Sequence, residues 1–348
     1  YYIKTAFRGK FGTFLAGFFS VAIILALGFM GCMVQSNSIA STCETAFGIP
    51  AWIWGIAVVA IAAYVFIGGV GRLAVVTEKI VPIMAIVYLI GGLIVLLANL
   101  PATGEAFALI FSCAFNPQAE IGGVTFGILA ALAQGAKRGL FSNEAGMGST
   151  PHAHAQANVK NPHEQGTVAL IGVFVDTFIV VTITALVVIS VLYTGNGALA
   201  QGAYEGIDKT NMAQLAFGSM FGEVGGNVFV AICLLFFAFS TIMSWNLFAK
   251  INVQYLFGKK AVPVFTVIAL VFIFMGSLLS NDLVWELADM FNQLMVLPNV
   301  IGLIALGGGV AACARTAGKS WGKAAAKIER EHEEGINTGN PDKPNWEV

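Results

Sequence analysis

Long apolar stretches, separated by short clusters of charged and turn-forming residues, dominate the pattern of this chain. The segments 11–43, 224–249 and 290–314 carry no charged residue, and each exceeds the roughly 20 apolar residues that cross a hydrocarbon core about 30 Å thick. Lipid cannot satisfy backbone hydrogen bonds, so a spanning segment is a helix or a barrel strand, and continuous apolar runs lack the alternation of a barrel strand. The pattern therefore predicts an all-α polytopic membrane protein that crosses a lipid bilayer.

The apolar runs and their flanking charges predict eight membrane elements. Lysine and arginine cluster at alternate ends of these elements, and placing those ends inside the cell leaves only Lys209 in an outer connection. We therefore expect a multi-pass protein of the cell membrane with a transmembrane domain at 1–314, a cytoplasmic tail at 315–348, and both ends of the chain cytoplasmic. The eight elements are 11–36, 50–70, 80–99, 121–158, 167–193, 224–256, 261–280 and 285–313.

Composition excludes several other classes of protein. The chain is 57% hydrophobic and 11% charged, which is far too apolar for a typical soluble domain. Its net charge of −1 argues against a nucleic-acid partner. His152 and His154 are two residues apart and do not share a helix face, so they are a poor metal site. With no HExxH motif and no paired serine and histidine, we expect neither an enzyme nor a cofactor.

The fourth element carries most of the candidate chemistry. Broken backbone at membrane depth is tolerated only where it is buried in protein or lines a watery cavity, and in transporters the half-helix ends bind charged groups and ions. Ser142, Asn143 and Glu144 would add a hydroxyl, an amide and a carboxylate at such a break. A helix kinked purely for packing is the alternative. The residues that oppose one smooth helix are Gly135, Gly139, Gly146, Gly148 and Pro151.

The fifth element contains one carboxylate, Asp176, about a third of the way along an otherwise uncharged span. An ionisable residue inside a membrane is costly, and by default it marks an ion or proton path. Because Thr177 lies beside it, we interpret Asp176 as a sodium ligand or as a carboxylate that tunes a sodium site. A proton relay is the alternative.

Polar residues in three other places are weaker candidates. Gln35 ends a stripe of small residues on the first element, and its buried amide would need partners. Ser240 and Thr241 lie together on the sixth element, where hydroxyls often bond their own helix backbone instead. Glu286 and Asp289 lie near the outer end of the last element and Asn292 and Gln293 lie deeper, and together they could form a gate or only a polar rim. The depth of Lys137 and Arg138 in the fourth element is left open by the sequence.

The segment GAKRGLFSNEAGMGSTPHAHA resembles the signature stretch of the sodium:alanine symporter family, the alanine or glycine:cation symporters. Four further segments resemble family segments in the same order, so the likeness covers essentially the whole chain. They are MVQSNSIA (33–40), VTEKIVPIMAIVYLIGG (76–92), FSTIMSW (239–245) and LPNVIGLIAL (297–306).

The resemblance implies the inverted-repeat, leucine-transporter-type fold of five helices followed by five, with the first and sixth core helices broken. The eight elements would then be core helices three to ten, and the broken fourth element would be the sixth. The implied activity is sodium-coupled symport of small neutral amino acids, alanine and glycine, by alternating access. By the same resemblance Ser240 and Thr241 would coordinate sodium. The residues implied to surround the amino acid are Gln35, Ser142, Asn143, Gly146, Met147 and Trp245.

Two departures from the family pattern qualify this implication. Cys32 stands where the family is expected to have asparagine. The first two core helices, with their Gly-Thr-Gly-Asn break, are missing, so we expect the chain to be N-terminally incomplete and unable to transport by itself. Two alternative functions remain: a non-transporting sensor or channel on the same fold, and a proton-coupled amino acid transporter.

Overall fold

The computed structural model describes residues 2–7, 9–67, 69–115, 124–159, 162–203 and 205–315. Within these ranges the regular secondary structure is helical and contains no strand. In chain order the elements are α1 (Tyr2–Ala6), α2 (Lys10–Ile23), η1 (Ile24–Gly31), α3 (Cys32–Phe47), α4 (Ala51–Ile67), α5 (Gly69–Ala98), α6 (Leu100–Phe115), α7 (Val124–Asn143), α8 (Pro151–His154), α9 (Pro162–Phe174), η2 (Val175–Val181), α10 (Thr182–Leu192), α11 (Met212–Phe221), α12 (Glu223–Phe257), η3 (Lys259–Ala261), α13 (Val262–Gly276) and α14 (Asn281–Arg315).

Six helical stretches in the described residues are long and apolar enough to cross a membrane. Each coincides with one of the eight predicted elements, and α4 is a shorter apolar helix at a seventh. The eighth is the interrupted pair α7 and α8. The prediction of an all-α membrane protein is therefore confirmed. The six stretches are Lys10–Phe47, Val81–Ala98, Pro162–Leu192, Glu223–Phe257, Lys259–Gly276 and Asn281–Ala311.

The structure differs from the predicted boundaries in two places. The first helical stretch continues to Phe47 rather than ending near residue 36, because the polar segment after Gln35 still packs against other helices. Residues 100–115, expected as a connection, form helix α6. The predicted tail at 315–348 lies outside the described residues apart from Arg315, where α14 ends.

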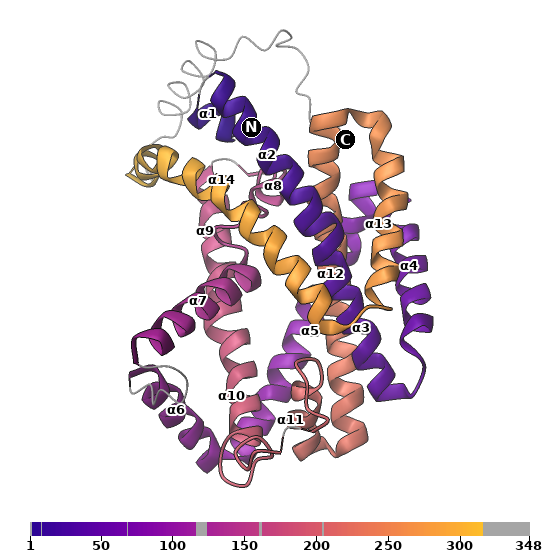
Figure 1. The fold of residues 1–348 in the computed structure, drawn as a ribbon, viewed down its shortest axis with the longest axis vertical. Helices are drawn as coiled ribbons and strands as arrows, with labels where there is room; N and C mark the ends of the chain where they lie inside the picture. The colour runs from indigo at the N-terminus through magenta and orange to yellow at the C-terminus, as the bar shows by residue number, and fades with distance from the viewer. Residues whose placement is uncertain are drawn as a thin grey trace.

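Helix α12 is the centre of the bundle. It packs against α3, α11, η1 and α5, while α3 also contacts α4 and α13. Figure 1 shows α4 and α13 along one side of the bundle and α6 and α7 on the opposite side, with α14 crossing in front beside α2. Small residues permit the close approach of η1 to α12, since a Cβ at Gly28 or Gly31 would lie 2.6 Å from Ala249 or the Trp245 ring.

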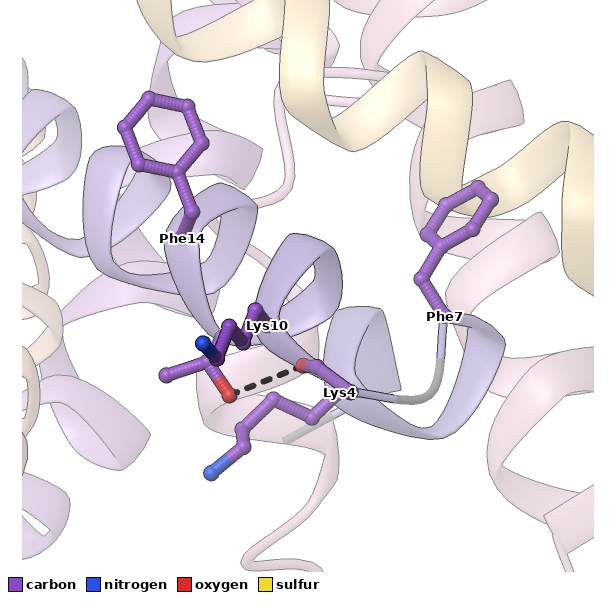
Figure 2. A pocket seen from close by; sticks show the side chains of 6 residues that line it. Lys4, Phe7, Lys10 and Phe14 are labelled. Carbon is purple, nitrogen blue, oxygen red and sulfur yellow. Dashed lines mark hydrogen bonds between the residues drawn. The ribbon is translucent and has the colours of Figure 1, made fainter.

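A hollow of about 590 Å³ lies where α1 meets α2. Figure 2 shows Lys4 and Lys10 beside it, with Phe7 and Phe14 on either side. Thr13 donates a hydrogen bond to the carbonyl of Gly9 across the turn. Lysines beside an exposed ring such as that of Phe14 are typical of a membrane–water interface, where cationic heads reach water and rings lie in the headgroup layer. The described residues that line this hollow include no carboxylate or amide side chain.

Candidate functional site

The fourth predicted element is broken, as its glycines indicate. Helix α7 ends at Asn143 and α8 begins at Pro151, and the intervening residues 144–150 are called the break below. Glu144, with a φ of 55°, is the one described non-glycine residue in the left-handed region, and Gly146 (104°) and Gly148 (88°) follow it. A left-handed conformation costs a residue with a Cβ roughly 1–2 kcal/mol, so strain at Glu144 is consistent with a functional segment.

Helix α14 holds the break in place through Asn299. The Nδ2 of Asn299 donates to the carbonyl of Gly146 at 2.6 Å, and the hydroxyl of Tyr2 donates to Asn299 Oδ1 at 2.6 Å. Asn299 is only 1% exposed, so both hydrogen bonds form away from water. Gly148 packs so tightly that a Cβ there would lie 2.8 Å from Asn299 and from the Phe19 ring.

The fifth predicted element contacts the end of α7, just before the break, through Asp176 and its neighbour Thr177. The hydroxyl of Ser142 donates to Asp176 Oδ2 at 2.8 Å, and Asn143 Nδ2 donates to the Thr177 hydroxyl at 3.3 Å. Both partners lie in η2, a π-helical segment inside the α9–α10 stretch. Such π-helical insertions occur frequently at functional sites because they turn side chains out of the regular register. Two candidates that the sequence placed on separate elements therefore lie in contact.

Glu144 and Trp245 form the contact between the break and α12. The indole Nε1 of Trp245 donates to Glu144 Oε1 at 2.6 Å. Phe141 lies between Trp245 and Trp285, with ring centroids 5.5 Å and 5.1 Å away. These aromatic rings join α7, α12 and α14 next to the break.

His152 has a structural role within the helical bundle. Its Nδ1 lies 2.9 Å from the carbonyl of Ser149, and Asn252 Nδ2 lies 2.8 Å from its Nε2. Because the amide donates to Nε2, Nδ1 is the protonated nitrogen and the imidazole is neutral. The ring also packs between Phe19 and Phe248. Both ring nitrogens are engaged, and no metal-binding cluster of histidine, cysteine or acidic residues occurs among the described residues.

The basic pair of α7 meets a carboxylate of the last helix. Arg138 donates from both terminal nitrogens to the two oxygens of Asp289 at 3.1 Å, and Lys137 Nζ lies 2.5 Å from Asp289 Oδ2. The guanidinium also lies over the Trp285 ring, 4.6 Å from its centroid. The sequence left the depth of Lys137 and Arg138 open, and the structure pairs them with Asp289, in the N-terminal part of α14 that was predicted to be the outer end of the last element.

The remaining candidates lie on α3 and α12. Ser240 and Thr241 both donate to the carbonyl of Phe237, at 2.8 and 3.0 Å, which is the local backbone bonding expected of hydroxyls in helices. Each hydroxyl oxygen keeps a lone pair that can coordinate a cation. Gln35 is half-buried on α3, one turn beyond Gly31, and Met147 is buried at the break.

A cavity of about 1130 Å³, called the vestibule below, extends to Asp176. Its charged lining has three basic and four acidic side chains, which leaves one net negative charge. The lining includes both members of the Lys209–Asp282 ion pair, which belongs to the predicted outer side. The vestibule exceeds the roughly 300–1,000 Å³ of common ligand pockets. Its charged residues are Lys137, Arg138, Asp176, Lys209, Asp282, Glu286 and Asp289.

Comparison with known families decides what this architecture is. The model of the sodium:alanine symporter family matches residues 1–329. The chain belongs to this family. Family members are transporters rather than enzymes, so the expectation of a membrane transport protein is confirmed.

Curated relatives of this symporter-family chain are similar over most of its length. It is 36% identical over 88% of its length to an uncharacterised transporter of Haemophilus influenzae, covering 65% of that protein. It is 37% identical over 80% of its length to the sodium/alanine symporter AgcS of Methanococcus maripaludis, covering 59% of it. A sodium/proton-dependent alanine carrier protein of Bacillus sp. PS3 is 34% identical over 82% of the chain, which covers 65% of the carrier. The chain thus spans less than two thirds of these relatives.

Sequence reasoning missed one residue and one contact of this symporter-family site. Asn299 was assigned no role. It could have been found, because it is a lone amide beside Pro298 in an apolar span, and a buried amide needs hydrogen-bond partners. The pairing of Glu144 with Trp245 joins residues 101 positions apart, and no local pattern encodes that distance.

Proposed function

We propose that the protein is a secondary active transporter that couples sodium entry to the uptake of small neutral amino acids, alanine and glycine, by alternating access. The break carries this proposal: it presents unwound backbone and polar side chains at the level of Asp176, beside the vestibule. Half-helix ends at membrane depth are the groups that bind charged substrate ends and ions in transporters. The family membership and the activities for which two relatives are named support the same activity.

The substrate site is proposed to surround the break. Its walls would come from the end of α7, the break itself, α3 and α12. Trp245, 2% exposed, would close one end with its ring and hold Glu144 with its indole. A closed site of this kind favours small side chains, since the aromatic rings of Phe141, Trp245 and Trp285 occupy the adjoining space. The proposed substrate-binding residues are Gln35, Ser142, Asn143, Gly146, Met147 and Trp245.

The sodium site is proposed to use Asp176 with Ser240 and Thr241. Asp176 already accepts a hydrogen bond from Ser142, so an ion bound there would act directly on the end of α7. No lysine or arginine of the described residues pairs with Asp176, which leaves its charge for a cation. One sodium entering across 100 mV contributes about 2.3 kcal/mol, enough for roughly fifty-fold accumulation of substrate.

The proposal includes the inverted-repeat fold and the orientation in the cell membrane. On the predicted sidedness both ends of the chain are cytoplasmic, and the vestibule faces the outside through Lys209 and Asp282. Sodium and amino acid would enter through it and stabilise a state in which the outer path closes and an inner path opens.

The test is uptake of labelled alanine by the full-length protein, including the two core helices that the family resemblance implies, reconstituted in liposomes under an inward sodium gradient. We expect saturable uptake that disappears when sodium is replaced by choline. Asp176→Asn should raise the sodium concentration for half-maximal uptake by at least tenfold at every pH tested, whereas the exposed control Glu223→Gln should leave it unchanged. Sodium dependence that survives Asp176→Asn unchanged removes the ligand role of Asp176.

The same assay separates the rival functions. A proton-coupled transporter would respond to an imposed pH gradient without sodium, and the name of the Bacillus sp. PS3 relative includes protons. A channel would pass alanine without saturation, and a sensor would bind it without uptake.

A further inference from the structure

Polar atoms without a partner gather around the break. Among the described residues, eight buried side-chain nitrogen and oxygen atoms have no hydrogen-bond partner. Four of the eight belong to three residues: Glu144 Oε2, Ser149 Oγ, and both Nδ2 and Oδ1 of Asn292. Ser149 is 0% and Asn292 7% exposed. A buried polar atom left unpaired costs about 1–3 kcal/mol, so this concentration indicates that something else completes the hydrogen bonds.

Helix register places Asn292 opposite the break. Trp285, Asn292 and Asn299 are spaced seven residues apart on α14, so their side chains share one face. The Trp285 ring contacts Phe141 of α7, and the Asn299 amide donates a hydrogen bond to the carbonyl of Gly146 in the break. Asn292, midway between them, therefore faces the level of Glu144.

Glu144 lacks a cationic partner inside this arrangement. Its Oε1 accepts from Trp245, and its Oε2 is buried with no partner. The Ser149 hydroxyl lies near enough to act on Glu144 as a weak hydrogen-bond donor, although the two atoms do not meet the geometry of a full hydrogen bond, and the Asp176 carboxylate adds a second negative charge nearby. In the described part of the chain Lys137 and Arg138 form ion pairs with Asp289, and His152 is neutral with both ring nitrogens hydrogen-bonded. A buried carboxylate of this kind is either protonated or, to remain charged, needs a positive group from elsewhere.

We propose that Asn292 is a substrate-binding residue whose amide, with Glu144 Oε2 and Ser149 Oγ, receives the ammonium group of the transported amino acid. This inference rests on the proposed function and adds a wall from α14 to the site. Three oxygen acceptors match the three N–H donors of a primary ammonium, and the single carboxylate balances its charge. The Asn292 amide nitrogen is then free to donate a hydrogen bond to a carboxylate oxygen of the same substrate.

The wild-type protein provides the first test, in which amino acid analogues compete with labelled alanine for uptake driven by an inward sodium gradient. Each methyl on the nitrogen removes one donor, so N-methylalanine should compete about tenfold less well than alanine and N,N-dimethylalanine about 100-fold less well. Lactate, which carries a hydroxyl in place of the ammonium, should not compete. Dimethylalanine that competes as well as alanine would overturn the inference.

Variants provide the second test. Asn292→Ala and Glu144→Gln should each raise the KM for alanine about 10- to 100-fold, the factor expected for a lost hydrogen bond to a charged group. They should also reduce the preference for alanine over N-methylalanine, a change that general destabilisation would not cause. Gln293→Ala, at the exposed neighbouring position of α14, is the matched control and should leave both values unchanged.

The outcomes separate this inference from the proposed function. Absence of sodium-driven alanine uptake by the wild type contradicts the proposed function itself. Normal wild-type uptake with an unchanged KM in Asn292→Ala contradicts only the inference. A variant that changes the sodium requirement but not the preference for alanine over N-methylalanine contradicts it also, because the three oxygens would then hold the coupling ion.

Discussion

Gly148 offers a direct test of the broken helix, through the substitution Gly148→Ala. The residue has a φ of 88° and a Cβ there would lie 2.8 Å from the Asn299 side chain and from the Phe19 ring. The left-handed conformation costs alanine roughly 1–2 kcal/mol, and forcing a methyl group into packed surroundings costs about 1–3 kcal/mol more. We therefore expect a loss of about 2–5 kcal/mol, a large part of a typical stability of about 5–15 kcal/mol.

The assay is thermal unfolding of the purified protein in detergent, followed by alanine uptake in liposomes. A loss of this size should lower the Tm by roughly 5–15 °C and should weaken uptake, because Asn299 can no longer hold Gly146. Gly139→Ala is the matched control, since Gly139 lies in α7 with no atom within 4 Å of the added methyl. It should keep or slightly raise the Tm, because alanine favours the helix by about 1 kcal/mol. A wild-type Tm for Gly148→Ala would refute the left-handed conformation and hence the break.

Three further predictions concern other parts of the structure. Asp289→Asn should lower the free energy of unfolding by about 1–3 kcal/mol because it leaves Lys137 and Arg138 without their acceptor. Asp282→Asn, whose ion pair with Lys209 is exposed, should lower it by less than about 1 kcal/mol. Equal shifts in Tm for the two variants would contradict the pairing. Gly31→Val should destabilise the protein by about 1–3 kcal/mol, as its Cβ would lie 2.6 Å from the Trp245 ring, while Gly17→Val, in open space, should not. Burial tends to raise the pKa of Asp208, but hydrogen bonds from the Thr210 hydroxyl and the backbone of Thr210 and Asn211 outweigh it and hold the pKa below its ordinary value. The stabilisation of the folded protein by the ionised carboxylate is therefore present at neutral pH and is lost as the pH falls through the lowered pKa. Plots of Tm against pH for Asp208→Asn and the wild type should converge only in strong acid.

The membrane elements could be predicted from the sequence because hydrophobic length is a local property. Charge and apolar runs gave the elements later observed as long helices, and Gly146 with Gly148 marked the break. Helix ends were harder: the polar residues between Gln35 and Phe47 looked like a loop but remain helical, since neighbouring helices satisfy them. Apolar pattern alone does not distinguish a connection from the short helix α6.

The site could be predicted only by its residue types. Ser142, Asn143 and Asp176 were each candidates, but their contacts join elements 34 residues apart. The partners of Glu144, Gly146 and Arg138 come from α12 and α14. Such pairings depend on how helices cross, and a single sequence does not contain that information. The family resemblance supplied the expected fold, yet it assigned no role to Asn292 or Asn299.

Alkylation of a cysteine at position 142 tests most directly whether the break binds substrate. Ser142 is exposed beside Asp176, so Ser142→Cys in a Cys113→Ser background should react with a small methanethiosulfonate reagent. The background protein without Ser142→Cys gives the residual labelling. If the break binds an amino acid together with sodium, alanine should slow the reaction when sodium is present and not when choline replaces it. Labelling at one rate with and without alanine, in a variant that still takes up alanine, would contradict the account.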